Sequence, residues 1–248
     1  KPVVVKRVLK LEDLSVFLME AVIQTIVRNA ASLGVPQVYK FAKSLFPVPI
    51  TRNGRTDVEM KESYVMIMEE INGPNLYDYD GDLETQVFAI IKGLKDLQDK
   101  VKFVHRDFHA GNIVISDKPY IIDFGMACVG GLKLRPFQNY IGDFATNCTN
   151  KSHDVCCLIV NLAGTGYLKK TAKEICDAYK KVVTESPSNE FDKNNTFDFQ
   201  GHHWKDVIFH WWYVTLLEDT ELKDYEPETF LKNHMKRTCL GWEVQLRF

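Results

Sequence analysis

Residues 103–125 read Phe-Val-His-Arg-Asp-Phe-His-Ala-Gly-Asn-Ile-Val-Ile-Ser-Asp-Lys-Pro-Tyr-Ile-Ile-Asp-Phe-Gly. In this stretch two short apolar runs, Asn112–Ile115 and Tyr120–Asp123, flank the sequence Ser-Asp-Lys-Pro. β-Branched residues favour strands, and Ser, Asp and Pro favour a tight reversal of the chain. The stretch therefore predicts a β-hairpin.

Three polar residues surround the predicted hairpin. Asp107 lies in a loop before the first strand, Asn112 begins that strand, and Asp123 ends the second strand. Phosphoryl transfer needs metal ions that neutralise phosphate charge, and a carboxylate that orients the attacking hydroxyl and accepts its proton. Mg²⁺ prefers hard oxygen ligands, which Asn112 and Asp123 can supply. These residues could serve an Mg-phosphate; the alternative is a hairpin with ordinary loop polar residues.

The order His105-Arg106-Asp107, then Asn112, then Asp123-Phe124-Gly125 resembles the catalytic-loop and metal-loop signature of the protein-kinase family. The resemblance implies an α+β, two-lobed fold with a small, mostly β N-lobe and a larger helical C-lobe. Residues 1–70 would form part of the N-lobe and residues 71–248 the C-lobe of one kinase domain. It also implies ATP and Mg²⁺ as cofactors, with Mn²⁺ as a possible substitute, and Asp107 as a catalytic residue.

The β-branched run before Val8 predicts a strand, and Lys6 within it matches the family's lysine that holds the α- and β-phosphates. Residues 12–31 have apolar side chains at helical spacing. The resemblance assigns Glu20, in the middle of this helix, as the carboxylate partner of Lys6; the alternative is a solvated helix charge. The family's glycine-rich loop lies upstream of this lysine, so we expect an incomplete N-lobe with an exposed sheet edge.

Residues 37–50 and 63–69 read as strands joined around Asn53-Gly54, a strong hairpin signal. The second strand resembles the family strand that leads into the hinge, and Met68 would be the gatekeeper. An adenine needs one donor and one acceptor in line. The residues that would meet its edge are Glu69, Glu70 and Ile71. A plain buried strand followed by a glycine turn is the alternative.

An amphipathic helix is predicted over residues 83–101. Residues 126–150 take the place of the family's activation segment but contain no Ala-Pro-Glu. Arg106 raises the possibility of pairing with a phosphate in that segment, at Tyr140, Thr146 or Thr149. Asp154 matches the family's aspartate that braces the catalytic loop, with Asp206 as a more distant rival. Further helices are predicted over residues 168–185, 203–218 and 226–238, with a polar loop over 186–201.

The segment Asp107-Phe108-His109-Ala110-Gly111-Asn112 is closer to the Asp-Leu-His-x-Gly-Asn of haspin-like protein kinases and of aminoglycoside and choline kinases. The reaction is therefore better defined than the acceptor. We expect phosphate transfer from ATP to a protein Ser or Thr hydroxyl. The alternatives are a kinase of a small hydroxylated or amino compound, and a pseudokinase that acts as a binding scaffold.

Composition excludes several other classes of protein. The chain has 248 residues, of which 45% are hydrophobic, and a formal net charge of −2, so it carries no overall electrostatic signal for nucleic acid or anionic lipid. No apolar run is long enough to predict a membrane span, and no signal peptide is visible. The six cysteines form no Cys-x-x-Cys pair, so we expect free thiols in an intracellular protein, cytoplasmic or nuclear. The sequence does not specify the oligomeric state.

Overall fold

The computed structural model describes residues 2–8, 14–52, 55–130, 151–166, 168, 170–175 and 225–233. The fold is α+β, as predicted. The helices and strands, in chain order, are β1 (Val3–Arg7), α1 (Leu14–Ala30), β2 (Val38–Arg52), β3 (Arg55–Glu69), α2 (Leu83–Val101), β4 (Ile113–Ile115), β5 (Pro119–Ile121) and α4 (His153–Leu162). Short 3-10 turns, η2 and η5, cover Ala110–Asn112 and Ala163–Thr165, and residues 227–233 are also helical.

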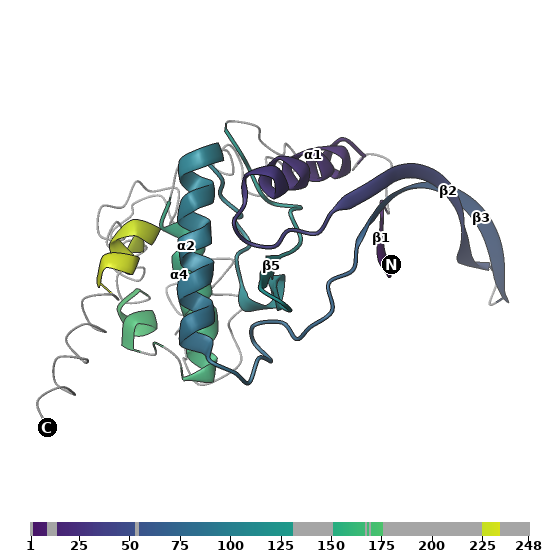
Figure 1. The fold of residues 1–248 in the computed structure, drawn as a ribbon. Helices are drawn as coiled ribbons and strands as arrows, with labels where there is room; N and C mark the ends of the chain where they lie inside the picture. Colours follow the sequence, from purple (N-terminus) through teal and green to yellow (C-terminus); the bar gives the residue numbers. More distant parts are fainter. Residues whose placement is uncertain are drawn as a thin grey trace, which may run out of the picture.

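The smaller part of the molecule is a three-stranded antiparallel sheet, in the order β1-β3-β2, with α1 beside it (Figure 1). Val8, Phe17 and Met66 form a small buried cluster between the sheet and the helix. Lys6 lies directly opposite Met66 in the register of β1 and β3. Because side chains directly opposite one another share a face of a sheet, Lys6 is placed on the face that meets α1.

The hairpin predicted around Asn53-Gly54 is confirmed, because Arg52 pairs with Arg55 across β2 and β3. Both strands have 15 residues and form a curved arm that projects from the body (Figure 1). Strand β3 begins earlier than the predicted residue 63. Residues 56–62 are mostly polar and exposed, so backbone pairing with β2, rather than apolar alternation, makes them a strand.

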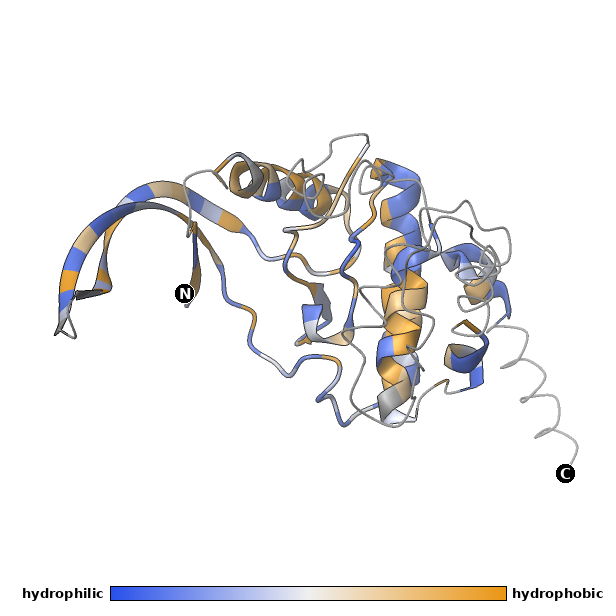
Figure 2. Cartoon of the chain, turned by 180° about the vertical axis from the view of Figure 1, so that it is seen from behind, coloured by the Kyte–Doolittle hydropathy of each residue, from blue (hydrophilic) through white to orange (hydrophobic). Residues whose placement is uncertain are grey.

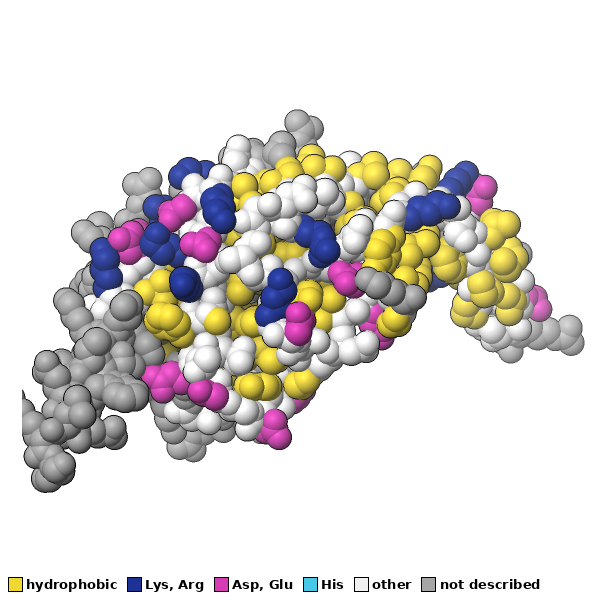
Figure 3. All heavy atoms as spheres, in the orientation of Figure 1, with side chains coloured by type: hydrophobic (Ala, Val, Ile, Leu, Met, Phe, Trp, Pro, Cys, Tyr) yellow, Lys and Arg dark blue, Asp and Glu magenta, His cyan; other side chains and the backbone are white. Residues whose placement is uncertain are grey.

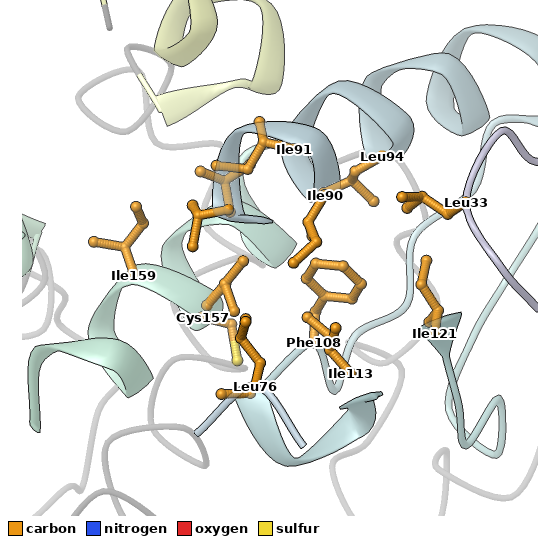
Figure 4. Close-up of a cluster of buried hydrophobic side chains, with 14 of the residues drawn as sticks. Leu33, Leu76, Ile90, Ile91, Leu94, Phe108, Ile113, Ile121, Cys157 and Ile159 are labelled. Atoms are coloured by element: carbon orange, nitrogen blue, oxygen red, sulfur yellow. The ribbon is translucent and has the colours of Figure 1, made fainter. Parts of the chain in front are cut away.

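Helix α2 has the predicted bounds. The Asp82 side chain accepts a hydrogen bond from the Thr85 N–H at 3.1 Å and caps its first turn, and Lys102 in the left-handed conformation ends it. Its apolar stripe packs against α4 and the catalytic loop. In Figure 4 the Phe108 ring lies among Ile90 and Leu94 of α2, Ile113 of β4 and Cys157 of α4. The main core therefore lies directly beneath the predicted catalytic residues.

The short hairpin of β4 and β5 is confirmed, with shifted ends. Asn112 closes the 3-10 turn before β4 instead of beginning the strand. Asp123 lies two residues beyond β5 and has a positive φ of 58°, which no strand residue adopts. Both polar residues thus lie outside the two strands, although the Asn112 carbonyl oxygen still accepts a hydrogen bond from the Ile122 N–H at 2.9 Å.

The cysteine prediction is correct in part. Cys156 and Cys157 are free and buried. Cys128 is disulfide-bonded, so the expectation of free thiols is wrong for this residue. The prediction depended on the spacing and the low density of the cysteines, and neither reports which sulfurs lie close together in space. Among the described residues, no helix is long and apolar enough to cross a membrane.

Several predictions fall outside the described residues. They are the phosphorylation candidates Tyr140, Thr146 and Thr149, the alternative brace Asp206, the loop over 186–201 and the helix over 203–218. The helices predicted over 168–185 and 226–238 are described only in part, and residues 170–175 and 227–233 are helical.

Candidate active site

Three charged side chains from distant parts of the chain meet at Lys6. The Lys6 Nζ donates to the Glu20 Oε1 at 2.7 Å and to the Asp123 Oδ1 at 2.8 Å. Lys6 comes from β1, Glu20 from the middle of α1, and Asp123 from the loop after β5. The predicted ion pair of Lys6 and Glu20 is therefore present, and the residue proposed as a metal ligand lies on the same ammonium group.

The charges of this triad follow from burial and mutual attraction. Burial by itself lowers the pKa of Lys6, but the two carboxylates outweigh it and raise that pKa above its usual value. Burial raises the pKa of Glu20, and the charge of Lys6 offsets only part of the rise. For Asp123 the attraction of Lys6 outweighs burial and lowers the pKa. At neutral pH Lys6 is therefore a cation held between carboxylates.

The catalytic loop brings Asp107 and Asn112 together. The Asn112 Nδ2 donates to the Asp107 carbonyl oxygen at 2.9 Å and to the Asp107 Oδ2 at 3.2 Å. The loop backbone is closed by a hydrogen bond from the His109 N–H to the Asp107 carbonyl oxygen at 3.0 Å. These bonds fix the Asn112 amide with its nitrogen toward Asp107, so its oxygen is the atom able to bind a metal ion.

Asp154, at the start of α4, holds the loop from below. Its two carboxylate oxygens accept from the His105 N–H at 2.8 Å and the Arg106 N–H at 2.9 Å. Burial favours the neutral acid, yet hydrogen bonding and charge interaction with His153 lower the pKa of Asp154 below its usual value. Arg106 has a φ of 66°, an uncommon conformation for a non-glycine residue. Asp154 therefore stabilises a strained backbone, as predicted from its position.

The Arg106 side chain is directed inward. Its Nε donates to the Met126 carbonyl oxygen at 2.6 Å. Burial lowers the pKa of Arg106 to about 10, against the opposing attraction of Asp154. The guanidinium remains charged at neutral pH and ties the catalytic loop to the segment after Gly125.

The predicted hinge residues follow the end of β3. Met68 lies against the Gln24 amide, with 4.0 Å between the Gln24 Nε2 and the Met68 Sδ. The Glu69 N–H donates to the Gln37 carbonyl oxygen, and the Glu70 N–H to that of Pro2. A backbone donor to an adenine edge from this segment would therefore have to come from Ile71. The adenine-binding role of Met68 and of residues 69–71 stays a prediction.

Sequence reasoning missed Asn161. Its Oδ1 accepts a hydrogen bond from the Ala110 N–H at 2.9 Å, from within α4. Together with Asp154 it gives α4 two contacts to the catalytic loop, two turns apart along the helix. A signal was available, because Asn161 is a polar residue in the otherwise apolar run from Val155 to Leu162.

The donor set fits a magnesium-nucleotide. Among the described residues no group of three or more His, Cys, Asp or Glu side chains could hold a metal ion. Mg²⁺ does not require one, since it is usually held by one or two carboxylates together with phosphate oxygens and water. Asp123, whose side chain is 52% exposed, and the amide oxygen of Asn112 are donors of this kind. Lys6 is a cation that could bind phosphate oxygens beside them.

Comparison with known proteins gives one family. Residues 74–132 match the phosphotransferase enzyme family, APH. The matched stretch contains the catalytic loop and the segment around Asp123. No curated protein matches the chain. The family match confirms the resemblance to the protein kinase-like superfamily, and over this stretch the chain is similar to phosphotransferases.

Proposed function

We propose that this protein is an ATP-dependent phosphotransferase that phosphorylates a hydroxyl group, with Mg²⁺ as its metal. One observation carries the proposal: Lys6 contacts both Glu20 and Asp123 at 2.7–2.8 Å. A lysine held by a buried carboxylate and adjacent to a metal-binding aspartate is the arrangement that protein kinases use for phosphoryl transfer. The family match over residues 74–132 supports the same reaction.

Each of the five residues has a separate role in the proposed transfer. Asp107 accepts the proton of the acceptor hydroxyl, whose oxygen forms a bond to the γ-phosphorus while the bond to the bridging oxygen of ADP breaks. Lys6 holds the phosphate oxygens, and Glu20 holds Lys6. Asn112 and Asp123 would hold Mg²⁺, which neutralises phosphate charge. The acceptor is thereby phosphorylated, and ADP leaves.

For the acceptor we propose a Ser or Thr hydroxyl of a protein. The complete His105-Arg106-Asp107 sequence supports this choice, because related kinases of small molecules more often have Gly in place of the arginine. The second candidate is a small hydroxylated or amino compound. Two observations favour it: His109 in the catalytic loop and the match to the phosphotransferase enzyme family.

The test is transfer of radiolabelled γ-phosphate to a peptide library and to a panel of metabolites, with Mg²⁺ or Mn²⁺. We expect Asp107→Asn to reduce transfer by about 10²–10⁴-fold, the usual contribution of a general base. Asp57→Asn is the matched control, because Asp57 is an exposed carboxylate on the projecting arm. It should retain wild-type transfer.

Transfer to peptides supports the protein-kinase proposal, and transfer only to metabolites replaces it with the second candidate. A wild-type protein that transfers phosphate to neither class would contradict the enzymatic proposal and favour a binding scaffold. An equal loss in Asp107→Asn and Asp57→Asn would show that Asp107 has no special part in the reaction.

A further inference from the structure

His109 lies inside the catalytic loop, between the proposed base and the proposed metal ligand. It precedes the 3-10 turn Ala110–Asn112, and its Nδ1 accepts a hydrogen bond from the Gly111 N–H at 3.1 Å. Nothing in the reaction as described above uses this side chain. Its ring is nevertheless held in one orientation by the backbone of its own loop.

The bond from Gly111 selects one form of the ring. A nitrogen that accepts a hydrogen bond carries no proton, so the neutral imidazole has its proton on Nε2. That nitrogen lies 3.7 Å from the Asp107 Oδ2. The ring therefore directs an N–H donor at the carboxylate of the proposed base.

The Asp107 Oδ2 accepts one hydrogen bond and has a second donor nearby, beyond hydrogen-bond distance. The Asn112 Nδ2 donates to the Oδ2 at 3.2 Å, and the His109 Nε2 faces the same atom. We propose that His109 is a positioning residue: its Nε2–H, together with Asn112, fixes the Asp107 carboxylate so that the Oδ1 accepts the proton of the acceptor hydroxyl. This 3.7 Å separation is longer than a hydrogen bond, and we expect it to shorten when substrate binds, as catalytic hydrogen bonds commonly do.

Gly111 leaves room for the His109 ring in this orientation. A Cβ added at Gly111 would lie 3.0 Å from both the Cε1 and the Nδ1 of His109. This contact is tighter than nearly all real Cβ contacts, so the ring would have to move by a few tenths of an ångström. Any side chain at position 111 would therefore disturb the orientation of His109, even though residue 111 itself contacts no substrate in the proposed reaction.

The inference depends on the proposed phosphotransfer for its kinetic consequence. We expect His109→Ala to lower kcat by up to about 100-fold, the order of effect of a small misplacement of a reacting group. The KM for ATP should change by less than about threefold, because Lys6, Asn112 and Asp123 remain in place. A merely structural role would not separate kcat from KM in this way.

Two conservative variants distinguish the ring nitrogens. The amide nitrogen of His109→Gln can reach the position of Nε2, whereas that of His109→Asn reaches only the position of Nδ1. We therefore expect Gln to restore kcat to within about threefold of wild type and Asn to behave as Ala does. Gly111→Ala should lower kcat in the same manner as His109→Ala. Restoration by Asn rather than Gln, or an unchanged kcat in His109→Ala, would overturn the inference.

A measurement without turnover separates this inference from the proposed function. In protein labelled with ¹⁵N at the histidine rings, the signals lost in His109→Gln identify His109. We expect Nδ1 without a proton and Nε2 with one, and Asp107→Asn should shift the Nε2 signal more than the Nδ1 signal. A proton on Nδ1, or no response to Asp107→Asn, refutes the inference whether or not phosphate is transferred. If these signals are as expected and no acceptor is phosphorylated, only the proposed function fails.

Discussion

The catalytic loop and the projecting arm of β2 and β3 are opposites in structure. The loop has an irregular backbone, with a positive φ at Arg106. The neighbouring side chains of Phe103 and Phe108 are nevertheless fully buried. The arm has regular strand geometry, yet its distal side chains are exposed. Figure 3 shows hydrophobic side chains on its surface; Leu45, Val58 and Met60 are 55–67% exposed.

The difference shows which part of the molecule needs side-chain contacts to hold its backbone conformation. Strained conformations persist only where the surroundings enforce them, and they gather at functional sites. Here Asp154 and Asn161, both on α4, hold the loop in its conformation through hydrogen bonds to its backbone. Figure 2 shows that α4 is mostly hydrophobic. The arm needs no such support, because the pairing of β2 with β3 satisfies its backbone. We therefore expect stability to depend on the loop and its core and not on the distal arm.

Two leucines test this comparison most strongly. Leu94 on α2 is 0% exposed, and Leu45 on the arm is 56% exposed. Leu94→Ala should lower the free energy of unfolding by about 2–5 kcal/mol, because it removes buried methyl groups and leaves a cavity. Leu45→Ala should change it by less than about 0.5 kcal/mol. Urea unfolding of both variants measures the difference, and similar losses would show that the arm is part of the folded core.

Asp154→Asn should have the next largest effect. Asn offers one acceptor oxygen where two backbone N–H groups now bind, so we expect a loss of about 3 kcal/mol in the free energy of unfolding. The pKa of Asp154 is lowered from 3.8 on folding, so its contribution is complete above that pH and declines as the pH falls below it. The difference between wild type and variant should therefore be constant near neutrality and shrink in acid.

The control for this variant is Asp57→Asn, which changes an exposed carboxylate on the arm. It should unfold as wild type does at every pH. A difference between wild type and Asp154→Asn that stays the same down to pH 3 would mean that the carboxylate charge of Asp154 does not support the loop.

Local sequence patterns predicted much of this structure. The apolar spacing of α2 gave its bounds, and the order of charged residues gave the Lys6–Glu20 pair through the family resemblance. The extent of β3 could not be predicted, because residues 56–62 have no buried face to produce an apolar alternation. The positive φ of Asp123 and the contact from Asn161 could not be predicted either, because each depends on how distant segments pack.

Shortening the arm should have the smallest effect. Deleting residues 47–52 and 55–60 would leave Phe46 and Lys61, which already pair, joined by Asn53-Gly54. This preserves the contact of the Arg7 guanidinium with the Phe46 ring, whose centroid lies 5.2 Å from the Arg7 Cζ. The removed side chains at residues 47–51 and 56–60 are exposed or half-buried, so the free energy of unfolding should change by less than about 0.5 kcal/mol. Phosphotransfer should also be unchanged, since Lys6 pairs with Met66, well inside the retained part of β3.

Thermal unfolding measures the stability of the shortened protein, and the transfer assay measures its activity. A large loss of stability would place the distal arm within the cooperative fold, whereas a loss of transfer alone would make it a substrate-binding element, and either result would end the contrast between a functional loop and a dispensable arm.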